Sequence, residues 1–249
     1  MTAAGPDPAV PRRALVTGSA RRLGRAMVLA LAADGFDMAL HGRQLDDDLQ
    51  RLADEVQALG RRTCTVTGDL ADPGGCQRLL DDSEAALGPM GVLVNSAATF
   101  PDDRLMTMQA TVTGEVLAVD LVSPLVLSQA FASQLPATAH GVIVNMLDQR
   151  VLKPTARRFS YTLAKTALWT ATRMMARELA PRIRVVGIGP GVAIRDVDMD
   201  EEASARLAAR APLGQTGSTE EVVAALRYLL AAGSVTGQMI IVDGGMHIG

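Results

Sequence analysis

The chain has 249 residues, of which 48% are hydrophobic and 20% charged, and its formal net charge at pH 7 is −3. These values fit one globular domain with a substantial core, and the charge gives no support for binding to nucleic acid or a membrane surface. The two cysteines, Cys64 and Cys76, match no metal-binding or redox spacing, so no metal is predicted and a reducing, cytoplasmic location is expected.

The composition of the N-terminal residues argues against a signal peptide, and the absence of long apolar runs argues against a membrane-spanning helix. Residues 1–12 contain Pro and Gly but no apolar core of the kind found in signal peptides, so a flexible tail is expected there. No apolar run approaches the roughly 18–20 residues that a membrane-spanning helix needs.

Short segments rich in Val, Ile and Leu alternate with helical patterns along the rest of the chain. In chain order, the predicted strands cover 13–18, 36–42, 62–70, 91–97, 141–147, 183–191 and 238–245. The predicted helices cover 24–35, 46–60, 72–88, 102–136 with an interruption near Ser123-Pro124, 159–180, roughly 200–210, and 218–233. This alternation predicts a single α/β domain over 13–249, a Rossmann-like doubly wound parallel sheet of about seven strands with helices on both faces. Residues 192–217 are expected to form a substrate lid.

The sequence "TGSARRLG" (17–24) follows the first predicted strand and opens the first helix. In doubly wound sheets, ligands bind beyond the carboxyl ends of the strands, and a helix N-terminus there offers free N–H groups to a pyrophosphate. Gly18 supplies the tight turn and Gly24 permits close helix packing. The turn is therefore expected to bind a dinucleotide.

The residues after the second predicted strand indicate which dinucleotide is bound. An acid at this point favours NAD, whereas an arginine favours the 2′-phosphate of NADP. The segment "LHGRQ" has Arg43 and no acid at 40–45, and Arg21 supplies a second cation in the turn. NADP(H) is the predicted cofactor, with two solvated surface arginines as the alternative interpretation.

Tyr161 and Lys165 are four residues apart on one predicted helix, and therefore on one face of it. An unperturbed tyrosine has a pKa of about 10, and a nearby ammonium group lowers it by stabilising the phenolate. Such a pair suits proton donation to an atom that receives hydride.

Together these features resemble the short-chain dehydrogenase/reductase family over nearly the whole chain. The matching motifs are Thr17-Gly18, "GDL" (68–70), "NSA" (95–97), Tyr161-x-x-x-Lys165, "PG" (190–191) and "VDGG" (242–245). The resemblance implies that Tyr161 is the proton donor and that Lys165 holds the nicotinamide ribose. It also implies cofactor contacts from Gly18, Arg21, Arg22, Leu23, His41, Arg43, Asp69, Leu70, Asn95, Ser96, Ala97, Pro190 and Gly191.

Two departures from the general pattern narrow the resemblance. Asp148 stands where the family usually has a serine, 13 residues before the tyrosine, and Arg22 stands where it usually has a glycine. This combination, with Phe100 after "NSA", resembles the pteridine reductases and the bacterial dihydromonapterin/dihydrofolate reductases of short-chain type. It implies that Arg22 contacts cofactor phosphate and pterin, that Phe100 stacks on the pterin, and that Asp148 acts with Tyr161.

The chemistry of a carboxylate at position 148 agrees with such a substrate. An ionised carboxylate only accepts hydrogen bonds, so Asp148 favours a substrate with N–H groups over a simple carbonyl. It should also raise the pKa of Tyr161, in opposition to Lys165. The alternative is an aspartate that caps a loop at the strand end.

Asp120 replaces an asparagine that is common in the family and carries a water chain to the lysine. Aspartate accepts the same hydrogen bonds but donates no amide proton, so the sequence leaves the proton relay behind Lys165 open.

The leading hypothesis is an NADPH-dependent reductase of a C=N bond in a dihydropterin or dihydrofolate. The alternatives are a carbonyl or 3-oxoacyl reductase and a non-catalytic NADP(H)-sensing protein. By resemblance, the helix over 159–180 packs in a homotetramer or dimer interface. The basic loop with Arg150, Lys153, Arg157 and Arg158 is interpreted as a solvated loop, although it could attract an anionic tail such as a folate glutamate.

Overall fold

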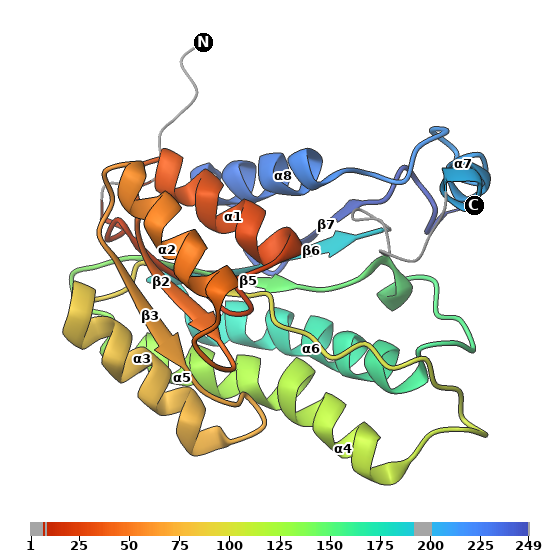
Figure 1. The fold of residues 1–249 in the computed structure, drawn as a ribbon, viewed down its shortest axis with the longest axis horizontal. Coiled ribbons are helices and arrows are strands. Elements are labelled where there is room, and N and C mark those ends of the chain that lie inside the picture. Colours follow the sequence, from red (N-terminus) through yellow and green to blue (C-terminus); the bar gives the residue numbers. More distant parts are fainter. Residues whose placement is uncertain (1–6, 8, 192–200, 249) are drawn as a thin grey trace.

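The computed structural model of the chain describes residues 7, 9–191 and 201–248. Seven strands form one sheet in the order β3-β2-β1-β4-β5-β6-β7, and all neighbouring pairs are parallel (Figure 1). The strands are β1 (Arg13–Val16), β2 (Asp37–Gly42), β3 (Thr63–Thr67), β4 (Val92–Asn95), β5 (Gly141–Met146), β6 (Ile183–Pro190) and β7 (Met239–Val242). The predicted doubly wound sheet is confirmed.

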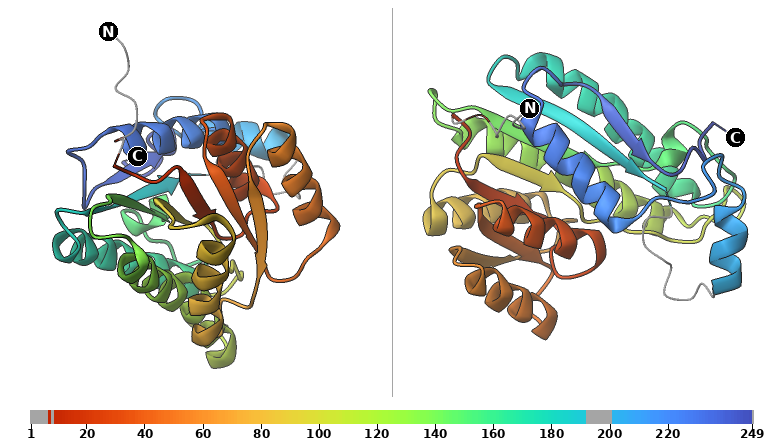
Figure 2. Two further views of the ribbon diagram at one scale, coloured as in Figure 1. Left: turned by 90° about the vertical axis from the view of Figure 1, so that its left-hand side faces the viewer. Right: turned by 90° about the horizontal axis from the view of Figure 1, so that it is seen from above.

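Helices cover both faces of the sheet, as the further views show (Figure 2). One face carries α1 (Arg22–Ala33), α2 (Asp47–Ala58) and α8 (Thr219–Ala231). The other carries α3 (Pro73–Leu87), α4 (Ala110–Leu117), η1 (Ala118–Val122), α5 (Ser123–Gln134) and α6 (Phe159–Glu178). The short elements η2 (Gln149–Val151) and α7 (Glu201–Ala208) lie beyond the carboxyl ends of the strands. Helix α8 begins on a capping box formed by Ser218 and Glu221.

Alternate residues of the central strands supply two separate cores. In β4, Val92 and Val94 pack in the core below α1 and α8, whereas Leu93 packs in the core below α3 and α5. The side chains of successive strand residues point to opposite faces, so a strand buried on both faces needs a continuous apolar run. This requirement explains why the strands could be recognised from the sequence.

The helical region predicted over 102–136 differs from the structure in two ways. Helix α4 begins at Ala110, and residues 102–109 form a loop and turn rather than a helix. The helix then runs through Pro124 without a break, because the preceding segment η1 is a π-helix. The wider π-turn accommodates a proline, which has no N–H to donate. It also contains Asp120, which is fully buried.

The continuous helix Ala110–Gln134 is long and apolar enough to cross a membrane by length and composition, with a mean hydropathy of 1.6. The apolar residues of this helix are interrupted by Asp120 and Pro124, so no such run is predicted from the sequence. Half of the most apolar 18-residue stretch of this helix is buried inside the protein, where the helix packs against α3 and α6. Its hydropathy is therefore explained by packing within the domain.

The predicted N-terminal tail over 1–12 is too long. Val10 is buried and belongs to the core, and the Ala9 carbonyl accepts a hydrogen bond from the His140 amide at 3.1 Å. Asp7 lies 2.7 Å from the His140 ring. Residues 1–6 and 8 lie outside the described part of the chain. The segment just before β1 is therefore packed against the domain, although its prolines suggested a tail.

Candidate active site

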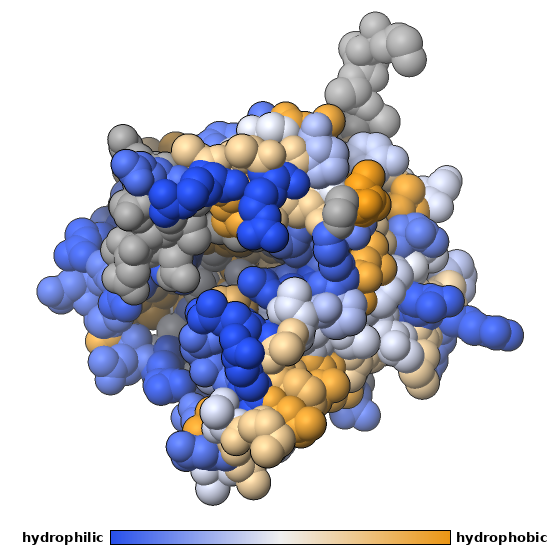
Figure 3. All heavy atoms as spheres, turned by 90° about the vertical axis from the view of Figure 1, so that its right-hand side faces the viewer, coloured by the Kyte–Doolittle hydropathy of each residue, from blue (hydrophilic) through white to orange (hydrophobic). Residues whose placement is uncertain are grey.

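A cavity of about 1160 Å³ lies at the carboxyl ends of the strands. Its wall includes the β1–α1 turn, residues that follow β4 and β5, the end of β6 and one face of α6. Strand order reverses between β1 and β4, and the crevice at such a point is where doubly wound sheets bind ligands. Figure 3 shows this face of the molecule, hollowed near its centre and bordered mostly by hydrophilic side chains.

The β1–α1 turn fits the predicted phosphate site in its backbone. Gly18 has a φ of 66°, and a Cβ there would lie 3.0 Å from Cα of Ala97. A Cβ on Gly24 would lie 2.0 Å from the carbonyl oxygen of Gly18, so only glycine allows this close approach. The Thr17 hydroxyl accepts hydrogen bonds from the amides of Ser96 and Ala97 and fixes the turn to the end of β4. The first amides of α1 thus face the cavity on a rigid support.

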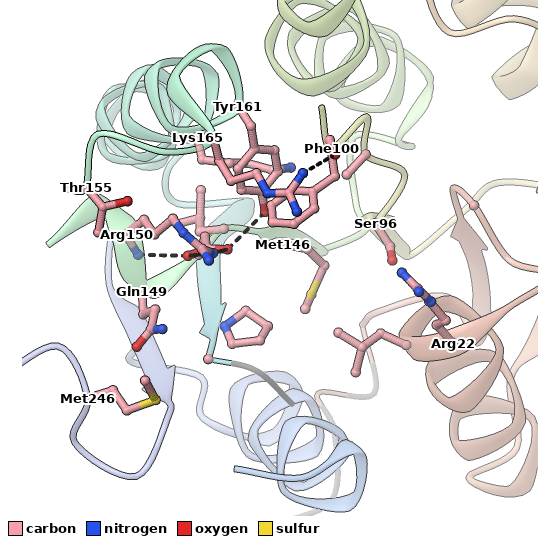
Figure 4. A pocket seen from close by; sticks show the side chains of 18 of the residues that line it. Arg22, Ser96, Phe100, Met146, Gln149, Arg150, Thr155, Tyr161, Lys165 and Met246 are labelled. Carbon is pink, nitrogen blue, oxygen red and sulfur yellow. Dashed lines mark hydrogen bonds and ion pairs between the residues drawn. The ribbon is translucent and has the colours of Figure 1, made fainter. Parts of the chain in front are cut away.

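The two arginines of the turn have different surroundings. Arg21 forms ion pairs with Asp48 at 2.6 Å and with Asp46 at 3.5 Å, an arrangement that the sequence did not predict. These pairs are exposed, and exposed pairs contribute little and exchange partners readily. Arg22 lines the cavity with a φ of 51°, and its side chain extends toward Ser96 (Figure 4). A left-handed conformation at a residue other than glycine is costly and is concentrated at functional sites.

Several residues expected to contact the cofactor do not line the cavity. His41 is buried; its Nδ1 accepts a hydrogen bond from the Gly18 amide at 3.2 Å, and its Nε2 lies 3.1 Å from the Gly68 carbonyl. Burial lowers the pKa of His41, which favours the neutral ring that this pattern requires. His41 thus supports the turn from behind rather than contacting a ligand.

Asn95 and Leu70 are also buried outside the cavity wall. The side-chain Nδ2 of Asn95 donates to Oδ1 of Asn145 at 2.8 Å, and this hydrogen bond joins β4 to β5. Arg43 and Asp69 are exposed and likewise do not line the cavity, whereas Leu23, Ser96, Ala97, Pro190 and Gly191 do.

All three predicted catalytic residues line the cavity, and Figure 4 shows Tyr161 and Lys165 side by side on its wall. The Tyr161 hydroxyl donates to Oδ2 of Asp148 at 3.2 Å. Nη1 of Arg150 lies 3.0 Å from the same oxygen, and the Arg150 amide donates to Oδ1 at 2.8 Å. Asp148 therefore both begins the η2 turn, as in the capping interpretation, and contacts Tyr161.

Behind Tyr161, Nζ of Lys165 lies 3.2 Å from Oδ1 of Asp120, and both side chains are almost completely buried. The other oxygen of Asp120 accepts a hydrogen bond from the Thr99 amide at 2.8 Å. Asp120 therefore balances the charge of Lys165, which an asparagine could not do.

Burial is the main influence on the acidic groups of the site. Burial raises the pKa of Asp148, against the opposing effect of Arg150. Burial also raises the pKa of Asp120, against Lys165. The pKa of Tyr161 is raised well above 10, first by burial and then by the charges of Asp148 and Asp120. The lowering expected from Lys165 is thus outweighed by burial and by the two carboxylates.

Phe100 lies at the cavity beside Tyr161, with the two ring centroids 4.6 Å apart and the planes at 89°. The guanidinium of Arg158 lies 4.3 Å from the Phe100 ring centroid and also donates to the Phe100 carbonyl at 3.0 Å. Arg158 has a φ of 58°. Phe100 is therefore held by specific contacts, as a stacking residue must be.

Other residues that line the cavity belong to no sequence motif, so they could not be predicted as site residues. Gln149 is 9% exposed, and its Oε1 has no hydrogen-bond partner among the described residues. Leu207, Arg210 and Met246 also line the cavity from the C-terminal third of the chain. The predicted lid lies partly outside the described residues, at 192–200, and Leu207 and Arg210 belong to the part that is described.

Comparison with known proteins identifies relatives along the full domain. A family model described as enoyl-(acyl carrier protein) reductase matches residues 18–247. FolM alternative dihydrofolate reductase 1 from Brucella canis, solved with NADP, is 37% identical with a TM-score of 0.89, covering 95% of this chain and 94% of that chain.

Curated relatives act on different substrates. An L-rhamnose 1-dehydrogenase (NAD(P)(+)) of a Sphingomonas species is 29% identical over 242 residues, which cover 94% of this chain and 95% of the relative. A 3-oxoacyl-[acyl-carrier-protein] reductase of Staphylococcus aureus is 26% identical over 242 residues, which cover 95% and 98% of the two chains. With the sheet order, the glycine turn and the Tyr161–Lys165 pair, these matches show that the chain belongs to the short-chain dehydrogenase/reductase family.

Proposed function

We propose that this NADP(H)-dependent oxidoreductase reduces a C=N bond of a dihydropterin or dihydrofolate, with Tyr161 as proton donor acting with Asp148 and Lys165. The observation that carries the proposal is the carboxylate of Asp148, which lies on the cavity wall and accepts a hydrogen bond from Tyr161. The similarity to an alternative dihydrofolate reductase supports the same substrate class.

The residues of the β1–α1 turn fit the dinucleotide. Gly18 allows the tight turn and Gly24 the close approach of α1 to it, so that the N-terminus of α1 can accept a pyrophosphate, whose charge Arg21 and Arg22 would neutralise. Pro190 and Gly191 line the same cavity near the catalytic side chains. When bound, the cofactor supplies the hydride; the remaining steps belong to the protein.

The carboxylate of Asp148 selects against a simple ketone. A ketone oxygen needs a hydrogen-bond donor, but an ionised carboxylate offers only lone pairs, so it repels the carbonyl oxygen. A pterin presents N–H and amino groups that such a carboxylate can accept. This preference distinguishes the site from the carbonyl-reductase alternative, for which a serine would be expected.

The raised pKa values suit proton delivery during reduction. Tyr161 remains a phenol at neutral pH because burial and two carboxylates oppose its ionisation. Its hydroxyl is oriented by the hydrogen bond to Asp148 and can give its proton to the substrate nitrogen once hydride has reached the adjacent carbon. The phenolate that is left on Tyr161 is stabilised by the positive charge of Arg150. The arrangement favours reduction as the working direction.

The experiment follows NADPH consumption in parallel with dihydrobiopterin, dihydrofolate and an acetoacetyl thioester. We expect turnover of at least one pterin and little turnover of the thioester. Turnover of the thioester alone would support the carbonyl-reductase alternative. Tight NADPH binding without turnover of any of the three would support the sensor, although an intact Tyr161–Lys165 pair has no use in a sensor.

We also propose that the chain forms a homo-oligomer, a tetramer or a dimer, through the outer face of α6. Leu163 and Met174 are exposed on this helix, with 49% and 66% of their surfaces accessible. They are eleven residues apart, which is close to three turns, so they lie on the same face.

A further inference from the structure

We propose that Lys153 and Arg210, which both line the cavity, form a subsite for an anionic tail of the substrate. The preferred substrate is then a pterin with a carboxylate-bearing substituent rather than a pterin with a neutral side chain. This inference rests on the function proposed above and decides between the substrates that it leaves open.

The cavity is strongly cationic although the chain as a whole is acidic. Eight Lys or Arg residues line it against the single carboxylate of Asp148, whereas the net charge of the chain is −3. Water-excluding walls concentrate the field of such a cluster and attract anions of the matching size. A neutral substrate would gain no electrostatic attraction from this positive charge.

Most of these cations already have an anionic partner. Lys165 is paired with Asp120, and Arg150 with Asp148. Arg157 and Arg158 share Asp102, at 2.6 Å and 3.8 Å. Arg21 is paired with acids of α2 at the other end of the cavity.

Lys153 and Arg210 differ from the others. Nζ of Lys153 donates only to the neutral carbonyl of Met246, at 3.3 Å. No carboxylate of the described residues lies within ion-pair distance of Lys153 or Arg210, and both side chains line the cavity. The basic loop of residues 150–158 therefore contains two kinds of cation. Arg150, Arg157 and Arg158 pair with carboxylates of the protein, whereas Lys153 is available for an anionic ligand.

The position of Lys153 excludes the cofactor phosphates as its natural partner. Figure 4 shows Arg22 and Ser96 at one side of the cavity and Thr155, Gln149 and Met246 at the other, with Tyr161 and Phe100 between them. The contact with the Met246 carbonyl places the Lys153 ammonium on the side of Met246. A flat ring held beside Phe100 and Tyr161 would direct its substituent toward this side, away from the phosphate turn.

The test compares two substrates that share the reducible ring. Dihydrofolate has a tail with two carboxylates, and dihydrobiopterin has an uncharged tail of hydroxyl groups. We expect the wild-type holoenzyme to have a higher kcat/KM for dihydrofolate, through a lower KM, and this preference should fall as NaCl is added. Equal values of kcat/KM at low salt would overturn the subsite while leaving the proposed function intact.

Variants then locate the effect. In Lys153→Gln combined with Arg210→Gln, the ratio of kcat/KM for dihydrofolate to that for dihydrobiopterin should fall by about tenfold, and the change should lie in the KM for dihydrofolate. The control is Arg78→Gln, an exposed arginine of α3 that does not line the cavity, for which the ratio should stay unchanged. Circular dichroism checks that all variants remain folded.

A binding measurement makes the result independent of turnover. Calorimetric titration of the NADP⁺-loaded protein with folate and with biopterin should show the same loss of folate affinity in the double variant. A double variant that binds folate as tightly as the wild type would overturn the subsite. Failure of every pterin as a substrate, with turnover of a thioester, would instead overturn the proposed function and the subsite with it.

Discussion

At the scale of single residues, the carboxylate of Asp148 distinguishes this site from one built for ketones. We expect Asp148→Ser to lower kcat/KM for a dihydropterin by about 10²-fold, since an acid–base group typically contributes this much or more. The NADPH dissociation constant should change little, because Asp148 contacts Tyr161 and Arg150 rather than the phosphate turn. Steady-state kinetics and NADPH fluorescence titration measure the two effects, and equal losses in both would contradict the proposed role.

A second prediction at this scale concerns Asp120. Its buried charge raises the pKa of Tyr161 and pairs with Lys165, so Asp120→Asn should lower the Tyr161 pKa. The reductive reaction needs the protonated phenol, and its rate falls where the phenol ionises. The alkaline limb of the kcat/KM profile should therefore move to lower pH in the variant. An alkaline limb at the wild-type position would show that Asp120 does not act on Tyr161.

The spacing of Tyr161 and Lys165 predicted that they share a helix face, and the resemblance to a known family added Asp148 to the group. The sequence could not predict that Arg150 would pair with Asp148 or that His41 would lie behind the turn. Both contacts depend on the path of a loop and on which way a strand residue faces, and neither has a spacing rule. The resemblance to known enzymes had assigned His41 to the cofactor itself.

At the scale of elements, the β1–α1 unit makes a prediction about stability. In Gly24→Ala, the added Cβ would meet the Gly18 carbonyl at 2.0 Å and force the helix away from the strand. We expect a loss of about 1–3 kcal/mol in the free energy of unfolding, with weaker NADPH binding. Denaturant unfolding and NADPH titration measure both.

The matched control is Gly114→Ala in α4, where a Cβ would have no neighbour within 4 Å. An alanine in a helix interior is more favourable than glycine by roughly 0.5–1 kcal/mol, so this variant should be slightly more stable than the wild type. If both variants lost stability to a similar extent, the close approach at Gly24 would not be the cause.

The elements also show where sequence patterns fail. Continuous apolar runs identified the strands, and α3 at Pro73 and α8 at Thr219 each begin one residue after the predicted start. The helix that contains Pro124 was expected to break there, but the π-helical segment η1 carries the chain through. A π-turn has no sequence pattern of its own, and its effect here is to place Asp120 beside Lys165.

At the scale of the whole molecule, the parallel doubly wound sheet was the most predictable feature and the N-terminal segment the least. Right-handed crossovers between parallel strands leave few possible topologies, and the crevice between β1 and β4 follows from them. No such rule applies to the N-terminal residues, because Val10 is buried by residues that are distant in the sequence and meet only in the folded domain.

The outer face of α6 leads to a prediction about assembly. Leu163, Met174 and the neighbouring Val122 of η1 are exposed apolar side chains on adjoining elements, and contact between copies would remove them from water. Leu163→Lys combined with Met174→Lys should convert the oligomer to a single chain of 26.1 kDa, measured by light scattering after size exclusion. Leu59→Lys, at another exposed apolar residue at the end of α2, should leave the mass unchanged. A wild-type protein that elutes as a single chain would contradict the interface, and a double variant with the wild-type oligomeric mass would place the contact on another face.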